Sequence, residues 1–172
     1  YLVSAGIALD VKAISRPSYP LIENSGKNLL KLYLNDVGLL TALFFKNNIQ
    51  AIMQDVRSIN LGSVYETVVA QELKAHGFGL YYYDNKKNGE VDYLIDDYSH
   101  LTVLPLEIKS GKDYMVHSAL DKLLSIDNYQ IKQAYVLSNE REVSVKDGIT
   151  YIPIYYIMFF RPEEEATSFD SL

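Results

Sequence analysis

The sequence predicts an α/β fold in which a mixed central sheet is flanked by helices. Residues 89–95 and 101–109 are rich in branched and aromatic side chains, and turn-forming residues separate them, which is typical of two antiparallel strands. A helix-length segment then leads from residues 101–109 to another apolar strand at 133–138. Strand, helix and strand at this spacing indicate a parallel pair. The 172 residues are enough for a single buried core.

Composition narrows the function classes. The chain is 48% hydrophobic and 22% charged, as ordinary globular proteins are. Its formal net charge of -6 argues against broad, charge-driven nucleic-acid binding, because modules of that kind are usually basic. The absence of cysteine excludes disulfides and thiolate metal sites, and it fits a cytoplasmic location. No apolar run approaches the about 18 residues of a membrane span, so no membrane partner is expected.

Residues 1–58 are expected to form a small N-terminal α/β extension. Asn35 or Asp36 offers a side-chain cap for a helix within it. The expected elements in order are the end of a helix at 1–9, a strand at 8–14, a strand at 29–34, a helix ending near 45 and a short helix at 48–56.

Residues 59–160 are expected to form the core domain, followed by a polar tail at 161–172. The first core helix is expected to start at Asn60, which can cap it, and to end near His76, before Gly77. The further elements expected are strands at 79–84, 89–95, 101–109, 133–138 and 149–154, a helix at 115–126 and a short apolar segment at 155–160. The three histidines, His76, His100 and His117, stand far apart and are expected at the surface or in loops.

Charged residues interrupt the two strands of the expected hairpin, which otherwise resemble core strands. Alternation places Glu90 and Asp92 on the side of Leu94 in the first strand, and Glu107 and Lys109 on one side of the second. A four-residue loop at residues 97–100 would bring the charges to one face, with Asp92 opposite Pro105 and Glu90 opposite Glu107. An odd-length loop would separate them unless a β-bulge intervenes.

Two explanations of these charges remain open from the residues alone. On a solvated face they would form ordinary ion pairs, which contribute only about 0–1 kcal/mol. In central strands covered on both faces, each ion would carry a desolvation penalty of roughly several kcal/mol. Charges persist in such a place when they satisfy one another or when they hold a metal ion.

Asp92, followed fifteen residues later by the triplet Glu107-Ile108-Lys109, resembles the signature of the restriction-endonuclease-like nuclease superfamily, an acidic residue plus Glu-X-Lys. Residues 89–93 and 105–111 are similar, more specifically, to a C-terminal domain of unknown function carried by many bacterial and archaeal AAA-type P-loop ATPases. Residues 31–39 and 62–66 resemble the same family, so the resemblance covers most of the chain. It implies a restriction-endonuclease-like core and an upstream ATPase domain as partner.

The resemblance also implies a metal-dependent site that hydrolyses phosphodiester bonds in nucleic acid, with DNA favoured over RNA. Asp92 and Glu107 would bind Mg²⁺ or Mn²⁺, which prefer oxygen ligands. Glu66, on the helix before the core strands, would complete the metal site directly or through water. Lys109 would stabilise the developing negative charge.

The sequence departs from the signature in two ways. Val91 stands where the superfamily usually has proline, and no Gln-x-x-x-Tyr helix follows, which argues against a processive exonuclease. Two functional hypotheses therefore stay open. The chain is either a nuclease domain attached to an ATPase, or a catalytically inactive nuclease-fold module for regulation or protein interaction. An unrelated α/β domain with simple ion pairs is the remaining alternative.

Overall fold

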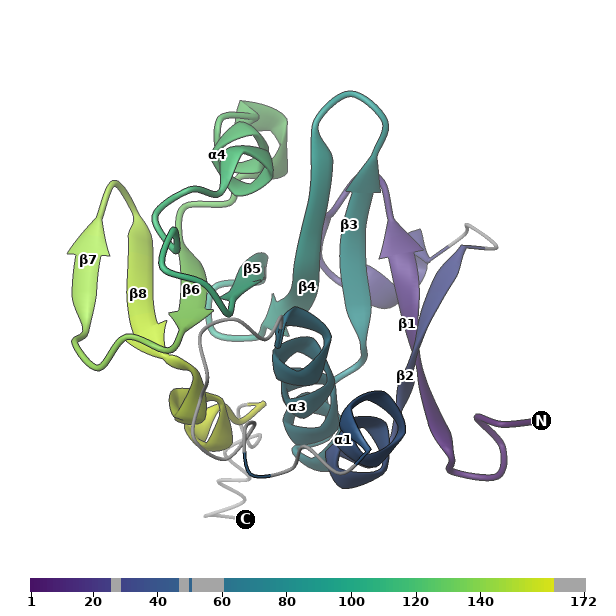
Figure 1. Ribbon diagram of the computed structural model, residues 1–172. Helices are drawn as coiled ribbons and strands as arrows, with labels where there is room; N and C mark the ends of the chain where they lie inside the picture. The colour runs from purple at the N-terminus through teal and green to yellow at the C-terminus, as the bar shows by residue number, and fades with distance from the viewer. Residues whose placement is uncertain (26–28, 47–49, 51–60, 163–172) are drawn as a thin grey trace, which may run out of the picture.

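The computed structural model describes residues 1–25, 29–46, 50 and 61–162, and this part of the chain is organised by one mixed sheet (Figure 1). The sheet order is β2-β1-β3-β4-β5-β6-β8-β7, so β4 and β5 lie at its centre. The predicted α/β fold with a mixed sheet flanked by helices is therefore confirmed. The strands are β1 (Ala8–Ile14), β2 (Leu30–Leu34), β3 (Tyr81–Asn85), β4 (Gly89–Asp97), β5 (Thr102–Lys109), β6 (Ala134–Ser138), β7 (Ser144–Lys146) and β8 (Ile149–Pro153).

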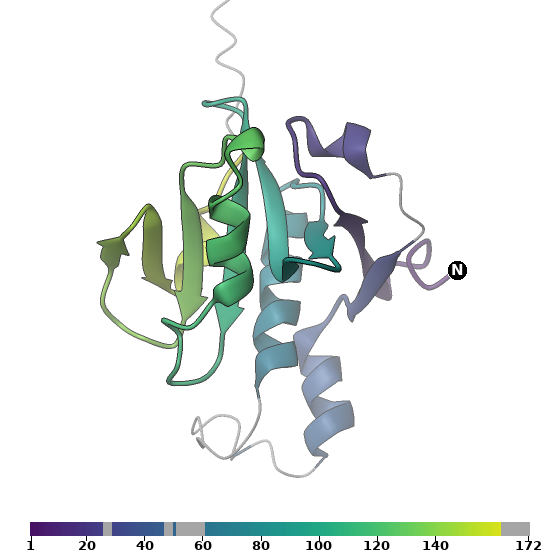
Figure 2. The same cartoon turned by 90° about the horizontal axis from the view of Figure 1, so that it is seen from above.

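Helices cover both faces of the sheet. In Figure 1, α3 lies in front of the sheet with α1 on one side of it and η3 on the other, and Figure 2 shows α4 alongside the strands from above. The helices are α1 (Val37–Phe45), α3 (Gly62–Ala75) and α4 (Ser118–Leu124), and the 3-10 helices are η1 (Leu21–Asn24), η2 (Asp127–Tyr129) and η3 (Ile154–Phe159). None of the described helices is both long and apolar enough to cross a membrane.

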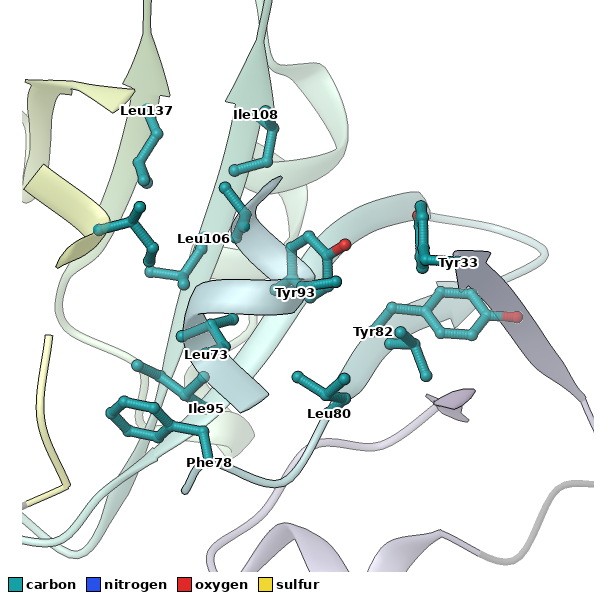
Figure 3. Close-up of a cluster of buried hydrophobic side chains, with 14 of the residues drawn as sticks. Tyr33, Leu73, Phe78, Leu80, Tyr82, Tyr93, Ile95, Leu106, Ile108 and Leu137 are labelled. Atoms are coloured by element: carbon teal, nitrogen blue, oxygen red, sulfur yellow. The ribbon is translucent and has the colours of Figure 1, made fainter. Parts of the chain in front are cut away.

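Each face of the sheet has its own apolar core. On the first face, Val69, Ala70 and Leu73 of α3 pack on strand residues such as Leu106, and the rings of Tyr33, Tyr82 and Tyr93 belong to the same cluster (Figure 3). On the second face, side chains of α4 and the strands form the other cluster, which includes Leu120, Leu123, Tyr81, Tyr83, Val91, Leu94, Val103 and Val136. We call these faces the α3 face and the α4 face. Two of the three consecutive tyrosines thus face one way and one the other, as alternation predicts.

The register of the central hairpin differs from the prediction by two residues. Leu94 pairs with Pro105 and Tyr93 with Leu106, whereas Asp92 was expected opposite Pro105. The four-residue loop is present, but it is displaced by one position along the chain, because the last pair is Asp97 with Thr102. Even-numbered residues still lie opposite odd-numbered ones, so the expected parity is confirmed.

A β-bulge in β4 breaks the alternation that the sequence suggested. Tyr81 pairs with Leu94 but Tyr83 pairs with Val91, so β4 holds one more residue than β3 over this stretch. Val91 and Leu94 consequently both lie on the α4 face. Glu90, next to Val91, projects from the α3 face, and the expectation that it shares a face with Leu94 is wrong. The expectation that the loop brings Glu90 to the face of Glu107 is wrong as well, because Glu107 lies beside Val136 on the α4 face.

The strands on either side of the hairpin extend the same sheet. β6 runs parallel to β5 after α4, as predicted. β1 and β2 of the expected N-terminal extension continue the sheet beyond β3, where β1 pairs parallel to β3. The Asp36 cap of α1 is confirmed by a 2.8 Å hydrogen bond from the Leu39 N–H. The expected helix end at 1–9 is wrong, because turns precede β1. The expected helix at 48–56, the Asn60 cap and most of the tail fall outside the described residues.

A substitution in the turn between β3 and β4 can test how tightly this hairpin packs on α4. Gly89 has a φ of +97°, and a Cβ built on it would lie 3.1 Å from the Cβ of Ala119. We expect Gly89→Ala to lower the free energy of unfolding by about 1–3 kcal/mol, because the backbone becomes strained and a helix must shift. Urea denaturation measures this loss.

Gly111→Ala is the matched control for that substitution. No atom of the described residues lies within 4 Å of a Cβ built at Gly111, and the φ of Gly111 is not positive. Its midpoint in urea should stay close to that of the wild type. Equal losses for the two variants would contradict the packing described for Gly89.

Candidate functional site

The candidate site lies where β4 and β5 part. Their paired residues end at Tyr93 and Leu106, while β5 continues beside β6 as far as Lys109, opposite Ser138. Ile108 is buried and lies beyond the last residue pair of β4 and β5, so no backbone oxygen of β4 is paired with its N–H. A carboxylate oxygen of Asp92, Oδ2, accepts that N–H at 2.7 Å. Asp92 therefore takes the place of a backbone acceptor and is fixed at the gap between the two central strands.

The surroundings of Asp92 favour its protonated form. Burial, followed by the charges of Glu107 and Glu66, raises its pKa from 3.8 to about 8, although the N–H of Ile108 and the charge of Lys31 act in the opposite direction. A carboxyl group with this pKa binds a proton at neutral pH in the absence of another cation. Asp92 is thus a position where a proton and a metal ion compete.

Glu107 is a buried carboxylate with one satisfied oxygen. The residue is only 7% exposed, and its Oε1 lies 2.8 Å from the Nζ of Lys109, two residues along the same strand. Its other oxygen, Oε2, is buried and has no hydrogen-bond partner within the part of the chain that the structure describes. An unpaired buried carboxylate oxygen is unfavourable, and such groups usually signal a ligand, an ion or a water at that point.

Glu66 approaches from α3 and is held by two tyrosines. The hydroxyl of Tyr33, on β2, donates to Glu66 Oε2 at 2.6 Å, and the hydroxyl of Tyr93, on β4, donates to the backbone oxygen of Glu66 at 2.8 Å. Burial and the neighbouring carboxylate raise the pKa of Tyr33, so its hydroxyl remains a donor at physiological pH. These bonds fix the Glu66 turn of α3 over β4.

Lys31, on β2, is a second cation near the carboxylates. Its ammonium contacts Glu90 Oε1 and lies 4.7 Å from the centre of the Tyr82 ring. Burial alone would lower its pKa, but the hydrogen bond and charge of Glu90, with the charges of Asp92 and Glu66, raise the pKa overall. Lys31 is therefore charged over the whole physiological range.

The structure brings Asp92, Glu107 and Lys109 to the end of the central strands, and Glu66 close enough to act on the charge of Asp92. Within residues 1–25, 29–46, 50 and 61–162, no group of three or more His, Asp or Glu side chains is arranged to hold a metal ion. The three-carboxylate metal site of Glu66, Asp92 and Glu107 thus stays a prediction.

Sequence reasoning gave no role to Lys31 and Tyr33. The two residues alternate on one strand and so share a face, which is a local signal. What the sequence does not reveal is that β2 and β1 join the sheet on the β3 side and carry this face toward α3.

His117 lies in the loop directly before α4, which agrees with the expected surface or loop position, but its side chain is not at the surface. His117 is 6% exposed, its Nε2 lies 2.7 Å from the hydroxyl of Tyr151, and its Nδ1 lies 2.9 Å from a carboxylate oxygen of Asp121. His100 is exposed, as expected, and His76 is half-buried at the end of α3.

The raised pKa of Asp92 predicts a pH-dependent stability. Between about pH 4 and pH 8 the folded chain keeps a proton on Asp92 that the unfolded chain releases, so stability falls as the pH rises. Asp92→Asn removes this titration and can still accept the N–H of Ile108. In the presence of a chelator, we expect Asp92→Asn to be more stable than wild type by about 1–3 kcal/mol at pH 8, with the difference disappearing toward pH 4. Urea denaturation at both pH values measures it.

Asp113→Asn, a change at an exposed carboxylate, is the control and should alter stability by less than about 0.5 kcal/mol at either pH. If the free energy of unfolding of Asp92→Asn exceeds that of wild type by the same amount at pH 4 and pH 8, Asp92 is not held protonated in the folded chain.

A family model described as "Domain of unknown function (DUF4143)" matches residues 61–157, which is more than half of the chain. The matched segment contains Glu66, Asp92, Glu107 and Lys109, whereas Lys31 and Tyr33 precede it. No curated protein and no solved structure matches the chain. The chain therefore belongs to the family of this domain of unknown function.

Proposed function

We propose that the chain is a metal-dependent phosphodiesterase of the restriction-endonuclease-like nuclease superfamily, forming the C-terminal part of an AAA-type ATPase. Its substrate would be nucleic acid, with DNA favoured over RNA. The observation that carries the proposal is Glu107, whose buried Oε2 has no hydrogen-bond partner among the described residues, while the neighbouring Asp92 carboxyl is held where β4 and β5 separate. A buried carboxylate oxygen without a partner, close to a second carboxyl group, is a fitting place for a divalent cation.

The side chains present fit Mg²⁺ or Mn²⁺ as a partly hydrated ion. Mg²⁺ in proteins is commonly held by one or two carboxylates and keeps several waters. Asp92 and Glu107 would supply the two carboxylates. Glu66 would act through water, because its Oε2 already accepts a hydrogen bond from Tyr33. This assignment needs no three-ligand cage of protein side chains.

A bound divalent ion would polarise the scissile phosphate and lower the pKa of a coordinated water. The residues of the chain would prepare the site for that chemistry. The Ile108 N–H orients the Asp92 carboxylate, and the Tyr33 and Tyr93 hydroxyls fix the α3 turn that carries Glu66. Lys109, paired with Glu107 at 2.8 Å, would place a positive charge next to the phosphate as negative charge develops.

The alternative, a catalytically inactive module for regulation or protein interaction, is favoured by a different observation. A cavity of about 710 Å³ begins at Ser110, directly after Lys109, and its cations are matched by carboxylates. Lys112 and Arg141 line it together with Glu140 and Glu142. A strongly basic groove would favour the binding of nucleic acid, but the charged residues that line this cavity are two basic and two acidic side chains.

Metal binding can be tested without any assay of activity. We expect Mg²⁺ or Mn²⁺ at millimolar concentration to raise the melting temperature of wild type, because an ion that binds only the folded chain stabilises it by mass action. Asp92→Asn should abolish the increase, whereas Asp113→Asn should retain it. A thermal shift that is absent in wild type, or equal in all three proteins, would contradict the metal site.

Cleavage of labelled DNA and RNA with Mg²⁺ or Mn²⁺ tests the activity itself. We expect cleavage by wild type and a loss of at least about 100-fold in Asp92→Asn and in Lys109→Gln, because each removes a charge at the reacting phosphate. Lys146→Gln, an exposed lysine on the edge strand β7, is the control for Lys109 and should keep full activity. The assay is repeated with the full-length ATPase. If the folded wild-type protein binds metal but cleaves neither DNA nor RNA in both forms, the result favours the inactive interaction module.

A further inference from the structure

Lys31 is an internal cation of the sheet that is assigned to no step of the proposed chemistry. It lies on β2, opposite Val11 of β1, and so projects from the α3 face, where Val11 packs. Its ammonium reaches the ring of Tyr82 on β3 and the carboxylate of Glu90 on β4. Lys31 thus extends across the sheet from its edge toward the strand that carries Asp92.

We propose that Lys31 binds a phosphate of the substrate backbone on the β2 side of the carboxylates, and that Glu90 holds this lysine in place until the phosphate displaces it. The proposal rests on the proposed function, because it assigns a second contact to the same nucleic-acid substrate. It gives the site one cation on either side of Asp92 in the sheet order, Lys109 on β5 and Lys31 on β2.

The surroundings of Lys31 leave its ammonium accessible to an anion from solvent. Its side chain is 24% exposed and that of Glu90 is 47% exposed, so the pair borders solvent and an incoming phosphate can reach it. The Tyr82 ring supports the ammonium from a fixed strand, which restricts the positions that the long side chain can take. A lysine ammonium is a point charge and accepts a phosphate oxygen in place of a carboxylate oxygen without a special geometry.

The charge balance of the site favours such a contact. Glu107 and Lys109 lie on the α4 face, beside Val136, whereas Lys31 and Glu90 lie on the α3 face, so a phosphate on the α3 face meets Lys31 and not Lys109. The four carboxylates Glu66, Glu90, Asp92 and Glu107 and the two ammonium groups together carry a formal charge of -2 when all are ionised. One divalent cation neutralises this charge but leaves no excess to attract a polyanion. A phosphate that replaces Glu90 at Lys31 gains a charge-assisted contact and leaves Glu90, which is half exposed, to water.

A binding experiment with three variants tests the proposal. Labelled duplex DNA is titrated with the full chain by fluorescence anisotropy, in Ca²⁺, at several salt concentrations. We expect Lys31→Gln to weaken binding roughly tenfold at low salt, because a hydrogen bond to a charged group is lost. The slope of log affinity against log salt should fall by about 0.9, the value for one phosphate contact on duplex DNA.

Glu90→Gln should shift affinity in the opposite direction, because it frees Lys31 and removes a competing negative charge. The double variant should bind like Lys31→Gln alone, since Glu90 acts on DNA only through Lys31. Lys12→Gln is the matched control. Lys12 lies on the neighbouring strand β1 between Val11 and Ala13, which pack on the α3 face, so it projects from the opposite face with the same charge. The DNA affinity and the salt slope of Lys12→Gln should match those of wild type.

The outcomes separate this proposal from the proposed function. Lys31-dependent binding without cleavage by wild type would support the phosphate contact while the hydrolytic activity fails. If wild type cleaves nucleic acid, and Lys31→Gln and Lys12→Gln both have the affinity, salt slope and KM of wild type, the phosphate contact of Lys31 is overturned. The proposed nuclease function would still stand. Wild-type protein with no affinity for DNA or RNA would overturn the contact as well. Urea denaturation confirms that each variant is folded.

Discussion

The hydrogen bond from the Ile108 N–H to Asp92 is the constraint on which the arrangement of the site depends. β5 continues beside β6 after it has lost β4 as a neighbour, so its buried N–H needs an acceptor. A side-chain carboxyl at 2.7 Å supplies it and is thereby drawn into the sheet. Burial then makes the ionised form of Asp92 unfavourable, and the same strand end carries Glu107 into the interior. Fold and electrostatics are coupled at this one bond.

The β-bulge explains how the two core faces and the site coexist on β4. One additional residue between Val91 and Leu94 keeps both of these side chains in the α4-face core. Tyr93 is turned to the α3 face, where its hydroxyl bonds the backbone of Glu66. Glu90 is left on the α3 face as well, within reach of Lys31 from the sheet edge. Strict alternation would have placed Glu90 with Leu94, away from β2's lysine. A single inserted residue thus decides which cation the acidic strand meets.

Local pattern was enough to predict the described strands other than the short β7, and the even–odd parity of the hairpin. It left open whether Glu107 is buried or lies on a solvated face. It could not predict the register within that parity, because the turn region 96–101 offers several places for a four-residue loop. Local pattern could not predict the bulge either, because strict alternation would separate Val91 from Leu94, and the structure places both in the α4-face core. Lys31 and Tyr33 reach the site through the sheet order, and the buried His117 contacts Tyr151, which is thirty-four residues later in the chain. These are contacts between distant segments, which no local period records.

The site is best understood as a competition between cations for buried carboxyl groups. Glu107 is satisfied at one oxygen by Lys109, and Asp92 is satisfied by a backbone N–H and, near neutral pH, by a proton. A metal ion that binds Asp92 must displace that proton, so binding strengthens as the pH rises toward the pKa of this group. The charge of Lys31 lowers the pKa of Asp92, and the carboxylate of Glu90 partly neutralises that charge. The ion pair between Lys31 of the edge strand β2 and Glu90 of β4 therefore acts on the Asp92 carboxyl through the charge of Lys31. This coupling distinguishes a prepared site from a collection of ordinary surface ion pairs, in which each pair would be independent of the next.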